Sequence, residues 1–431
     1  MHGGSVGCFE DLFKLLYLKL VRIKNVCMKR LIYVLAIVAL CIDISAQDIS
    51  QWRGPSRSGV YNETGLMKKW PAPGPKMLWH FDNLGDGFGS AAVTSSGVYI
   101  TGLTGETGFV YALDHQGKLL WKKEYGKDWN GSHVGTRATP LVIGDKLYLI
   151  SAFGKLVCMS TSDGKTIWSI DFMKQYDARN TEWGIVENLV YDGNVIYCVP
   201  GGRDANIVAL DRNTGKIIWK NKGTGEISGY SSPLLIKLSG RKLLVTHMER
   251  SITGIDASNG SVLWKSELVN QYSIHPNVPA YVNGYLYCTV GYGVGGVMLK
   301  LSADGSSVST VWKNSDMDPK IGGFVVLDGK IYGTGDFHRG FYCLDWLTGK
   351  TLYKISQLAP ANIIANDVLL YLYSERGQVA LVEPQAAGFN IISQFAVPMG
   401  QGPHWAHLVL HNKRLYVRHG RSLMVYNVAG N

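Results

Sequence analysis

One twelve-residue stretch constrains this chain more than any other part of it. It reads Val208-Ala-Leu-Asp211-Arg-Asn-Thr-Gly215-Lys-Ile-Ile-Trp219, which is typical of a strand, a tight turn and the start of a second strand. Asp211 can fold its carboxylate back onto the turn amides, and Gly215 accepts a positive φ without strain. The apolar run that ends at Trp219 restarts a strand whose indole needs a partner surface.

The same pattern recurs along the chain, which makes it an architecture and not a single hairpin. The aromatic residues that mark it are Trp79, Trp121, Trp168, Trp219, Trp264, Trp312, Tyr353 and Phe395. Their mean spacing is (395 − 79)/7, about 45 residues, which is the length of a four-stranded propeller blade. Eight marks predict an all-β, eight-bladed β-propeller of four-stranded antiparallel blades over residues 76–431, with the six tryptophans as structural docking residues.

The two ends of the chain carry incomplete repeats that complement each other. The last repeat has strands at 414–418 and 423–426 but no terminal tryptophan strand, and Trp79 stands in a strand without its front half. Pairing these two ends closes the ring and removes an exposed sheet edge. The sequence therefore predicts closure of the propeller by its N- and C-terminal strands.

Residues 1–46 differ from everything that follows. Met28-Lys29-Arg30 precedes a twelve-residue apolar run, 31–42, and small residues end at Ala46, which is the pattern of a secretory signal peptide with an upstream extension. Met28 is the expected true start. We expect an exported, periplasmic or envelope-associated mature chain from Gln47, without a transmembrane segment; lipidation at Cys41 is the alternative. Residues 47–75 are expected to be a lead-in that packs on one face of the propeller.

Charge and cysteine content exclude several classes of protein. The chain has a net charge of +10; residues 1–46 hold six Lys/Arg and three Asp/Glu, so the remainder carries 37 − 30 = +7. It shows no basic run, and a nucleic-acid partner is not expected. Four cysteines remain, each inside an apolar strand, and the preferred interpretation is buried free thiols, although sequence leaves their disulfide state open. They are Cys158, Cys198, Cys288 and Cys343.

The repeat resembles the tryptophan-docking repeat of the pyrroloquinoline-quinone-like β-propeller family. The lead-in Trp52-Arg-Gly-Pro55 and the stretch Gly229-Tyr-Ser-Ser-Pro233 are also similar to exported bacterial members, including the outer-membrane assembly scaffold propellers. The resemblance covers about residues 50–428. It implies the fold; for function it implies either a quinoprotein dehydrogenase or a non-catalytic scaffold.

The residues argue against the dehydrogenase. Those enzymes share two adjacent cysteines over the quinone and a calcium site of Glu, Asn and Asp beside a catalytic Asp. Here the closest of the four remaining cysteines, Cys158 and Cys198, are 40 residues apart, and no calcium triad can be placed. Pyrroloquinoline quinone with calcium is therefore disfavoured, and no cofactor is expected.

Any ligand site is expected on the face where the loops between blades meet near the axis. The candidate funnel residues include an arginine, carboxylates, aromatics and histidines, which suit a polar or anionic small molecule stacked on an aromatic ring. They are Arg137, Glu182, Trp183, Glu187, Tyr230, His247, His275, Asn277, Asp336, His338, His404 and Trp405.

Each candidate also has a structural interpretation. Arg137 can tie loops together through Glu182 or Glu187. His275 and His404 more often fill a channel or cap a turn than bind a metal, and no metal site is predicted. Trp183 can simply cover the loops.

We expect a monomeric, non-catalytic envelope propeller that binds a polar small molecule or an envelope protein. The alternative is an enzyme, either a quinoprotein-type dehydrogenase or a carbohydrate-active propeller that uses this funnel. Glu182 and Glu187 are a candidate carboxylate pair for the latter.

Overall fold

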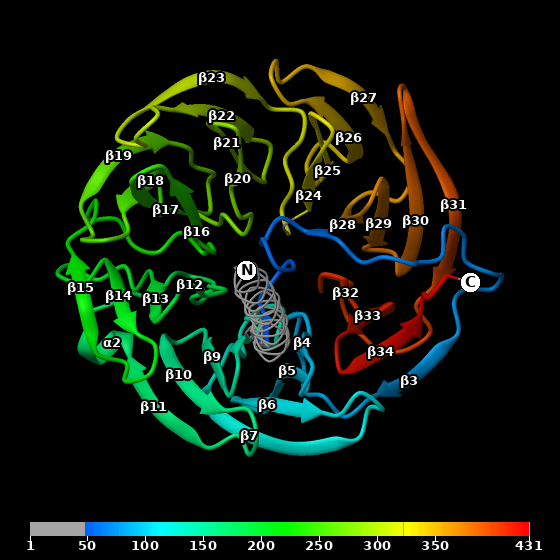
Figure 1. Cartoon of the computed structure of the whole chain (residues 1–431), viewed down its shortest axis with the longest axis horizontal. Coiled ribbons are helices and arrows are strands. Elements are labelled where there is room, and N and C mark those ends of the chain that lie inside the picture. Colours follow the sequence, from blue (N-terminus) through cyan, green and yellow to red (C-terminus); the bar gives the residue numbers. More distant parts are fainter. Residues whose placement is uncertain (1–47, 322, 431) are drawn as a thin grey trace, which may run out of the picture. The chain divides into compact units, whose positions relative to one another are not determined.

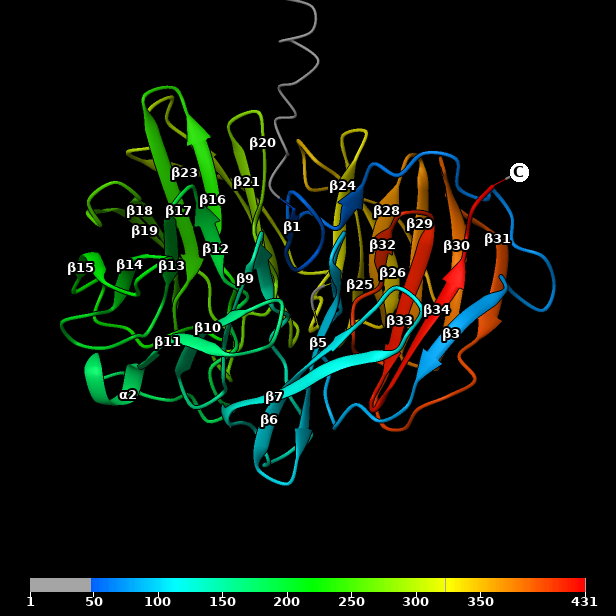
Figure 2. The same cartoon turned by 60° about the horizontal axis from the view of Figure 1, so that its bottom comes forward.

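The computed structural model describes residues 48–321 and 323–430, and the predicted signal peptide lies outside this range. The described chain forms eight antiparallel sheets arranged around a central axis (Figures 1 and 2). In each sheet the innermost strand lies near the axis and the outermost strand at the rim. The predicted all-β, eight-bladed propeller is therefore confirmed.

The blades follow one another in chain order, and seven of them consist of four consecutive strands. The first four blades are β4 (Ala92–Thr94), β5 (Gly97–Thr104), β6 (Thr107–Leu113) and β7 (Leu119–Lys127); β8 (Leu141–Ile143), β9 (Lys146–Ile150), β10 (Lys155–Ser160) and β11 (Thr166–Asp171); β12 (Val190–Asp192), β13 (Val195–Cys198), β14 (Ile207–Asp211) and β15 (Ile217–Asn221); β16 (Leu234–Leu238), β17 (Arg241–His247), β18 (Ser251–Asp256) and β19 (Val262–Glu267).

The next three blades keep the same order, and the eighth takes its outer strand from the beginning of the chain. They are β20 (Ala280–Val282), β21 (Tyr285–Val290), β22 (Gly295–Leu301) and β23 (Val308–Asn314); β24 (Phe324–Leu327), β25 (Lys330–Gly335), β26 (Gly340–Asp345) and β27 (Thr351–Ile355); β28 (Ala361–Asn366), β29 (Leu369–Ser374), β30 (Gln378–Gln385) and β31 (Gly388–Ala396); and β32 (Val409–His411), β33 (Arg414–His419), β34 (Ser422–Asn427) and β3 (Met77–Phe81).

Ring closure occurs where it was predicted. β3 pairs antiparallel with β34, with Trp79 opposite Val425, and Figure 1 shows the two strands side by side at the rim. Within the described residues the helical content is one short element, α2 (Phe172–Gln175), and no helix there is long and apolar enough to cross a membrane.

The repeated turn has the chemistry that its sequence indicates. The Asp211 carboxylate accepts hydrogen bonds from the amides of Asn213 and Thr214 at 3.0 and 2.9 Å, and Gly215 has φ +70°. A Cβ on Gly215 would also lie 2.9 Å from the Trp168 ring of the preceding blade. The glycine is therefore required twice, for its backbone conformation and for the indole that packs on it.

Each of the six tryptophans at the marks reaches the next blade in the same way. The indole N–H donates to a backbone carbonyl of the following turn at 2.9–3.2 Å, and the acceptors are His115, Thr161, Arg212, Ala257, Gly305 and Trp346. A hydrogen bond of this kind contributes about 1 kcal/mol, and the buried ring adds apolar area. The blades are thus joined by one repeated contact.

The last mark, Phe395 in the seventh blade, departs from the tryptophan pattern. Phe395 is smaller than an indole, and Trp70 from the lead-in packs against it with ring centroids 5.5 Å apart. Trp70 is 2% exposed and belongs to the core cluster between the seventh and eighth blades. An aromatic ring from outside the repeats therefore fills this blade interface.

The lead-in crosses the central channel between two opposite parts of the ring. β1 (Ile49–Ser50) extends the second blade by pairing with β8, and β2 (Val60–Tyr61) extends the seventh by pairing with β28. Between them Arg53 donates to the carbonyls of Ser58 and Phe324, and the latter contact is short. Inner-strand carbonyls that face the axis thus find donors in the lead-in.

Arg57 anchors the same segment to the third blade. It donates to the carbonyls of Asn188 and Leu189, both at 2.8 Å. The neighbouring Glu187 is buried and accepts the Val199 amide at 3.0 Å. Burial raises the pKa of the Glu187 carboxyl to about 8, against the opposing effects of that amide and of Arg57.

The docking contact predicts different costs for two glycine substitutions. A Cβ on Gly260 (φ +81°) would lie 2.6 Å from the Trp219 ring, whereas one on Gly284 (φ +86°) would meet nothing within 4 Å. Gly284→Ala carries only the backbone cost of about 1–2 kcal/mol, and Gly260→Ala adds displacement of the indole, about 1–3 kcal/mol more. Guanidinium unfolding should show a clearly lower midpoint for Gly260→Ala. Equal midpoints would mean that the indole contact is dispensable.

The buried Glu187 predicts a dependence of stability on pH. The folded chain keeps this carboxyl protonated up to about pH 8, while the unfolded chain releases the proton near 4.5. Stability should therefore fall between these values as pH rises, by up to about 1.4 kcal/mol per pH unit. The glutamine in Glu187→Gln cannot ionise. The free energy of unfolding of this variant, relative to that of the wild type, should therefore increase from pH 5 to pH 8. Parallel pH curves for the two proteins would contradict this.

Candidate functional site

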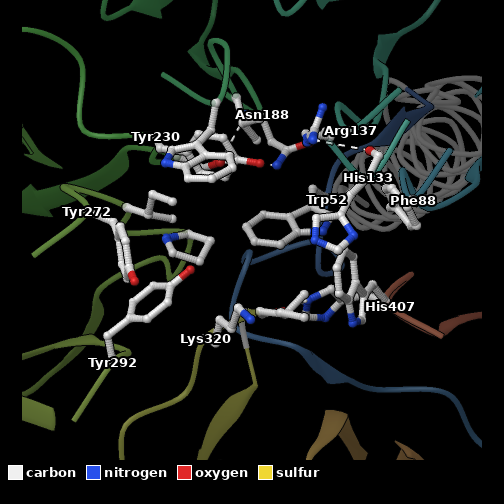
Figure 3. A pocket seen from close by; sticks show the side chains of 17 residues that line it. Trp52, Phe88, His133, Arg137, Asn188, Tyr230, Tyr272, Tyr292, Lys320 and His407 are labelled. Carbon is white, nitrogen blue, oxygen red and sulfur yellow. Dashed lines mark hydrogen bonds between the residues drawn. The ribbon is translucent and has the colours of Figure 1, made fainter. Parts of the chain in front are cut away.

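The loops that enter the blades converge on the axis and enclose a cavity of about 350 Å³ (Figure 3). Loops before β4, β8, β12, β16, β20, β24 and β32 contribute to it, as do the β21–β22 turn and the lead-in. The lining is mostly aromatic or apolar with a few cations. It consists of Trp52, Phe88, His133, Arg137, Trp183, Val186, Asn188, Tyr230, Ser232, Tyr272, Ile274, Pro276, Tyr292, Lys320, Ile321, Trp405 and His407.

The lead-in contributes Trp52 to the wall of this cavity, and the Trp52 ring packs against His407. Their ring centroids are 5.1 Å apart, and both residues are buried. His407 Nδ1 lies 3.1 Å from Arg53 and its Nε2 lies 3.0 Å from the Ile321 carbonyl. Burial, together with the Arg53 charge, lowers the pKa of His407 to about 3, so the ring is neutral at physiological pH.

Two groups of aromatic side chains line the wall on different sides. Tyr272 and Tyr292 meet edge to face with centroids 4.6 Å apart, and Trp183 lies 6.5 Å from Tyr272. On the other side, Trp405 lies 5.1 Å from Phe88 and 4.7 Å from His133. Such rings can hold a planar or apolar group between them.

The two strongly basic side chains of the lining come from separate loops and lie apart in Figure 3. Arg137 lies over the Trp129 ring at 5.1 Å and donates to three carbonyls of its own loop at 3.3–3.4 Å. Lys320 lies over the Tyr292 ring at 5.5 Å. Among the residues that the structure describes, neither cation forms an ion pair with a carboxylate.

The polar side chains deeper in the wall are already used. Asn188 accepts the Thr139 amide at 2.8 Å and donates to Ser232, whose hydroxyl also accepts the Asn188 amide. Burial raises the pKa of the Tyr230 hydroxyl, and the nearby Arg137 partly offsets this increase. The cavity therefore offers cations and phenol hydroxyls, and no carboxylate is among its lining residues.

A second, much smaller cavity lies beside the first and shares Lys320, Ile321 and Trp405 with it. It contains the carboxylates of Asp336 and Glu375, and Glu375 accepts the Trp405 indole N–H at 3.2 Å. Burial raises the pKa of both carboxyls; their mutual repulsion further raises that of Glu375. These two carboxyls therefore adjoin the main cavity without lining it.

Four of the funnel residues proposed from sequence line the main cavity: Arg137, Trp183, Tyr230 and Trp405. Asp336 lines the smaller one. Glu187 is buried beside Arg57, whereas Glu182 is exposed and lines neither cavity, so these two carboxylates do not form a pair in either cavity.

The remaining candidates lie in the surrounding structure. His247 and His275 are buried against each other with centroids 5.4 Å apart, and Asn277 donates to the Pro319 carbonyl at 2.7 Å. His338 Nδ1 lies 4.0 Å from buried Asp318. His404 is stacked on His419 at 3.7 Å, and its pKa is lowered to about 4 by burial and by that neighbour.

Sequence reasoning did not select several residues that line the cavity, namely Trp52, Phe88, His133, Tyr272, Tyr292 and Lys320. Phe88 and Lys320 stand in loops that the repeat places at the axis, so a rule that includes every large side chain in those loops would have found them. Trp52 belongs to the lead-in, whose path across the channel no repeat predicts.

No group of three or more His, Cys, Asp or Glu side chains that could hold a metal ion occurs among residues 48–321 and 323–430. The four cysteines of this part of the chain are buried free thiols, as the sequence suggested. Their burial raises the thiol pKa, which disfavours the reactive thiolate.

Comparison with known proteins finds relatives of two kinds. The chain is 25% identical over 249 residues to the quinoprotein alcohol dehydrogenase PedH of Pseudomonas putida, covering 56% of this chain and 39% of that protein. It is 26% identical over 208 residues to the outer membrane protein assembly factor BamB of Kangiella koreensis, covering 47% of this chain and 48% of the relative. The chain thus spans less than half the length of each of these relatives.

A solved structure shows the same fold over more of the chain. The crystal structure of BamB from Moraxella catarrhalis superposes with a TM-score of 0.57 at 14% identity, covering 82% of this chain and 99% of that one. A family model described as outer membrane protein assembly factor BamB matches residues 106–354, which is more than half of the sequence. This chain therefore belongs to that family of pyrroloquinoline-quinone-like β-propellers, as its docking repeats suggested.

Proposed function

We propose that this chain is an exported envelope protein that acts as a non-catalytic, protein-binding scaffold in outer-membrane protein assembly. The observation that carries this proposal is the make-up of the axial cavity, which combines aromatic side chains with Arg137 and Lys320 and contains no carboxylate. Aromatic residues and arginine are the side chains that protein interfaces favour. The family description and the BamB relatives support the same role.

The residues present do not fit the quinoprotein alternative. Calcium is bound by several oxygen ligands, usually carboxylates, and a dehydrogenase also needs a base for the alcohol proton. Two carboxylates that adjoin the cavity, Asp336 and Glu375, lie in the smaller neighbouring cavity, where Glu375 is held by the Trp405 indole. The cysteines lie in four different blades and cannot form an adjacent pair.

Calorimetric titration of the chain from Gln47 with pyrroloquinoline quinone tests this alternative directly. We expect no calcium-dependent binding, because the lining has no carboxylate to share the ion with the quinone. A binding constant that rises at least tenfold when calcium is added would overturn the scaffold proposal. Equal, weak binding with and without calcium would reflect only the two cations and the aromatic rings.

The scaffold role predicts what happens in the native host. The protein should be recovered from the envelope fraction with its N terminus near Gln47, and crosslinking there should join it to proteins of the outer-membrane assembly machinery. Deletion of the gene should lower the amount of folded outer-membrane β-barrel protein, and a plasmid copy should restore it. Unchanged amounts, together with an absence of crosslinked envelope proteins, would refute the role.

A further inference from the structure

Several large apolar side chains are exposed to solvent around the rim of the axial cavity. Tyr272, which lines the cavity, is 44% exposed, and so is Val134, the neighbour of the lining residue His133. Phe337, in the β25–β26 turn, is 73% exposed; a Cβ on Gly293, the neighbour of Tyr292, would lie 3.4 Å from its ring. Large apolar side chains exposed together mark interaction surfaces, whereas a single one does not.

These rim residues surround a donor-rich pocket. Arg137 is held in place by the Trp129 ring and by its own loop, and Lys320 by the Tyr292 ring, so both charges are fixed before any ligand arrives. Because the Asn188 side chain already donates to Ser232, the donors that the lining offers a ligand are mainly the two cations, the phenol hydroxyls and the buried Trp183 indole N–H, which has no hydrogen-bond partner among the described residues. Such a set recognises an acceptor, and a carboxylate accepts best from arginine.

The side of the cavity near Arg137 is the more favourable one for an anion. Asp336 and Glu375 lie close enough to Lys320 for its charge to lower the pKa values of two carboxyls. Arg137 lowers the pKa of the buried Asp128 carboxyl in the same way, but Asp128 already accepts the Trp129 and Ala152 amides, so Lys320 is the more strongly balanced of the two cations. Arg137 lies away from Lys320 in Figure 3, beside Tyr230 and Asn188. An incoming carboxylate is therefore directed to Arg137.

From these observations we infer that the axial cavity and its rim bind a segment of a partner protein in which an acidic residue is flanked by aromatic or aliphatic residues. The acidic side chain meets Arg137, and the flanking side chains cover Tyr272, Tyr292 and Phe337. A cavity of about 350 Å³ holds little more than one or two side chains, while the exposed rim extends the contact beyond it. A small ligand would leave that rim uncovered. This inference rests on the proposed scaffold function and names its site and the chemistry of its partner.

Selection of a random heptapeptide display library on the purified chain from Gln47 tests the inference. We expect the enriched peptides to share an Asp or Glu beside an aromatic or aliphatic residue. The best peptide, made synthetically, should lose at least tenfold in affinity when its acidic residue is replaced by the matching amide. The same loss should follow from Arg137→Gln, and the two changes together should cost no more than either alone. Arg203→Gln is the control, because Arg203 is exposed and lies outside the cavity lining.

Three results would overturn the inference: no enrichment, enriched peptides without an acidic residue, or equal affinity for the wild type and Arg137→Gln. Binding of indole-3-acetate at the cavity without binding of any peptide would assign the site to small carboxylates instead. Thermal unfolding of Arg137→Gln shows whether the variant is folded. Tyr272→Ser, which removes a ring that both lines the cavity and is exposed at its rim, provides a second variant that should also weaken peptide binding. If envelope crosslinks persist in Arg137→Gln, the partner uses another surface and the scaffold function stands; if the wild type forms none, the scaffold function itself fails.

Discussion

The contact between one indole and the next turn is what the rest of the molecule depends on. Trp168, for example, places its ring on Gly215 and its N–H on the Arg212 carbonyl, so a side chain from one blade is fixed by the backbone of the next. In the six blades that carry this tryptophan, the contact runs from the outer strand to the following blade, and Trp79 joins the eighth blade to the first. The pairing of β3 with β34 places Trp79 in the eighth blade and so closes the ring with the two ends of the chain.

The inner strands of the closed ring have backbone carbonyls that face the axis, and side chains of the lead-in donate hydrogen bonds to several of them. Arg53 and Arg57 are long enough to reach carbonyls in three blades, and both are buried. Burial lowers the pKa of each guanidinium to about 10, which still leaves both charged at physiological pH. The same segment also contributes Trp52 to the wall of the axial cavity. One stretch of backbone therefore both satisfies the inner-strand carbonyls and lines the cavity.

The docking contact also explains which parts of the structure could be predicted from sequence. The pattern of Asp211, Gly215 and Trp219 lies within a few residues of sequence. One copy predicts only a hairpin, but its repetition along the chain predicts the propeller. The loops that reach the axis follow from the repeat, which is why Arg137, Trp183, Tyr230 and Trp405 were placed near the cavity they line.

Other features depend on contacts between distant residues that no local pattern encodes. The path of the lead-in, the burial of Glu187 under Arg57 and the filling of the Phe395 interface by Trp70 are of this kind. His404 was a funnel candidate, yet it is half-buried outside the cavity lining, stacked on His419 with its Nδ1 2.7 Å from the Tyr373 hydroxyl. Sequence reasoning placed these loops correctly but could not tell which side chains within them face the cavity.

The residues that join the blades and the residues that line the cavity are different sets, and this limits what similarity to a relative implies about function. The residues that hold the blades together, such as Trp219 and Gly260, do not line the cavity, and those that line it, such as Lys320 and Tyr292, do not dock blades. A substitution in the lining set can therefore alter the cavity without removing a contact that holds the blades together. A dehydrogenase and an assembly factor match this chain at nearly the same identity, 25% and 26%, so identity alone does not distinguish the two roles. The scaffold proposal therefore rests on the lining set, in which Arg137 and Lys320 stand where calcium chemistry would need oxygen ligands.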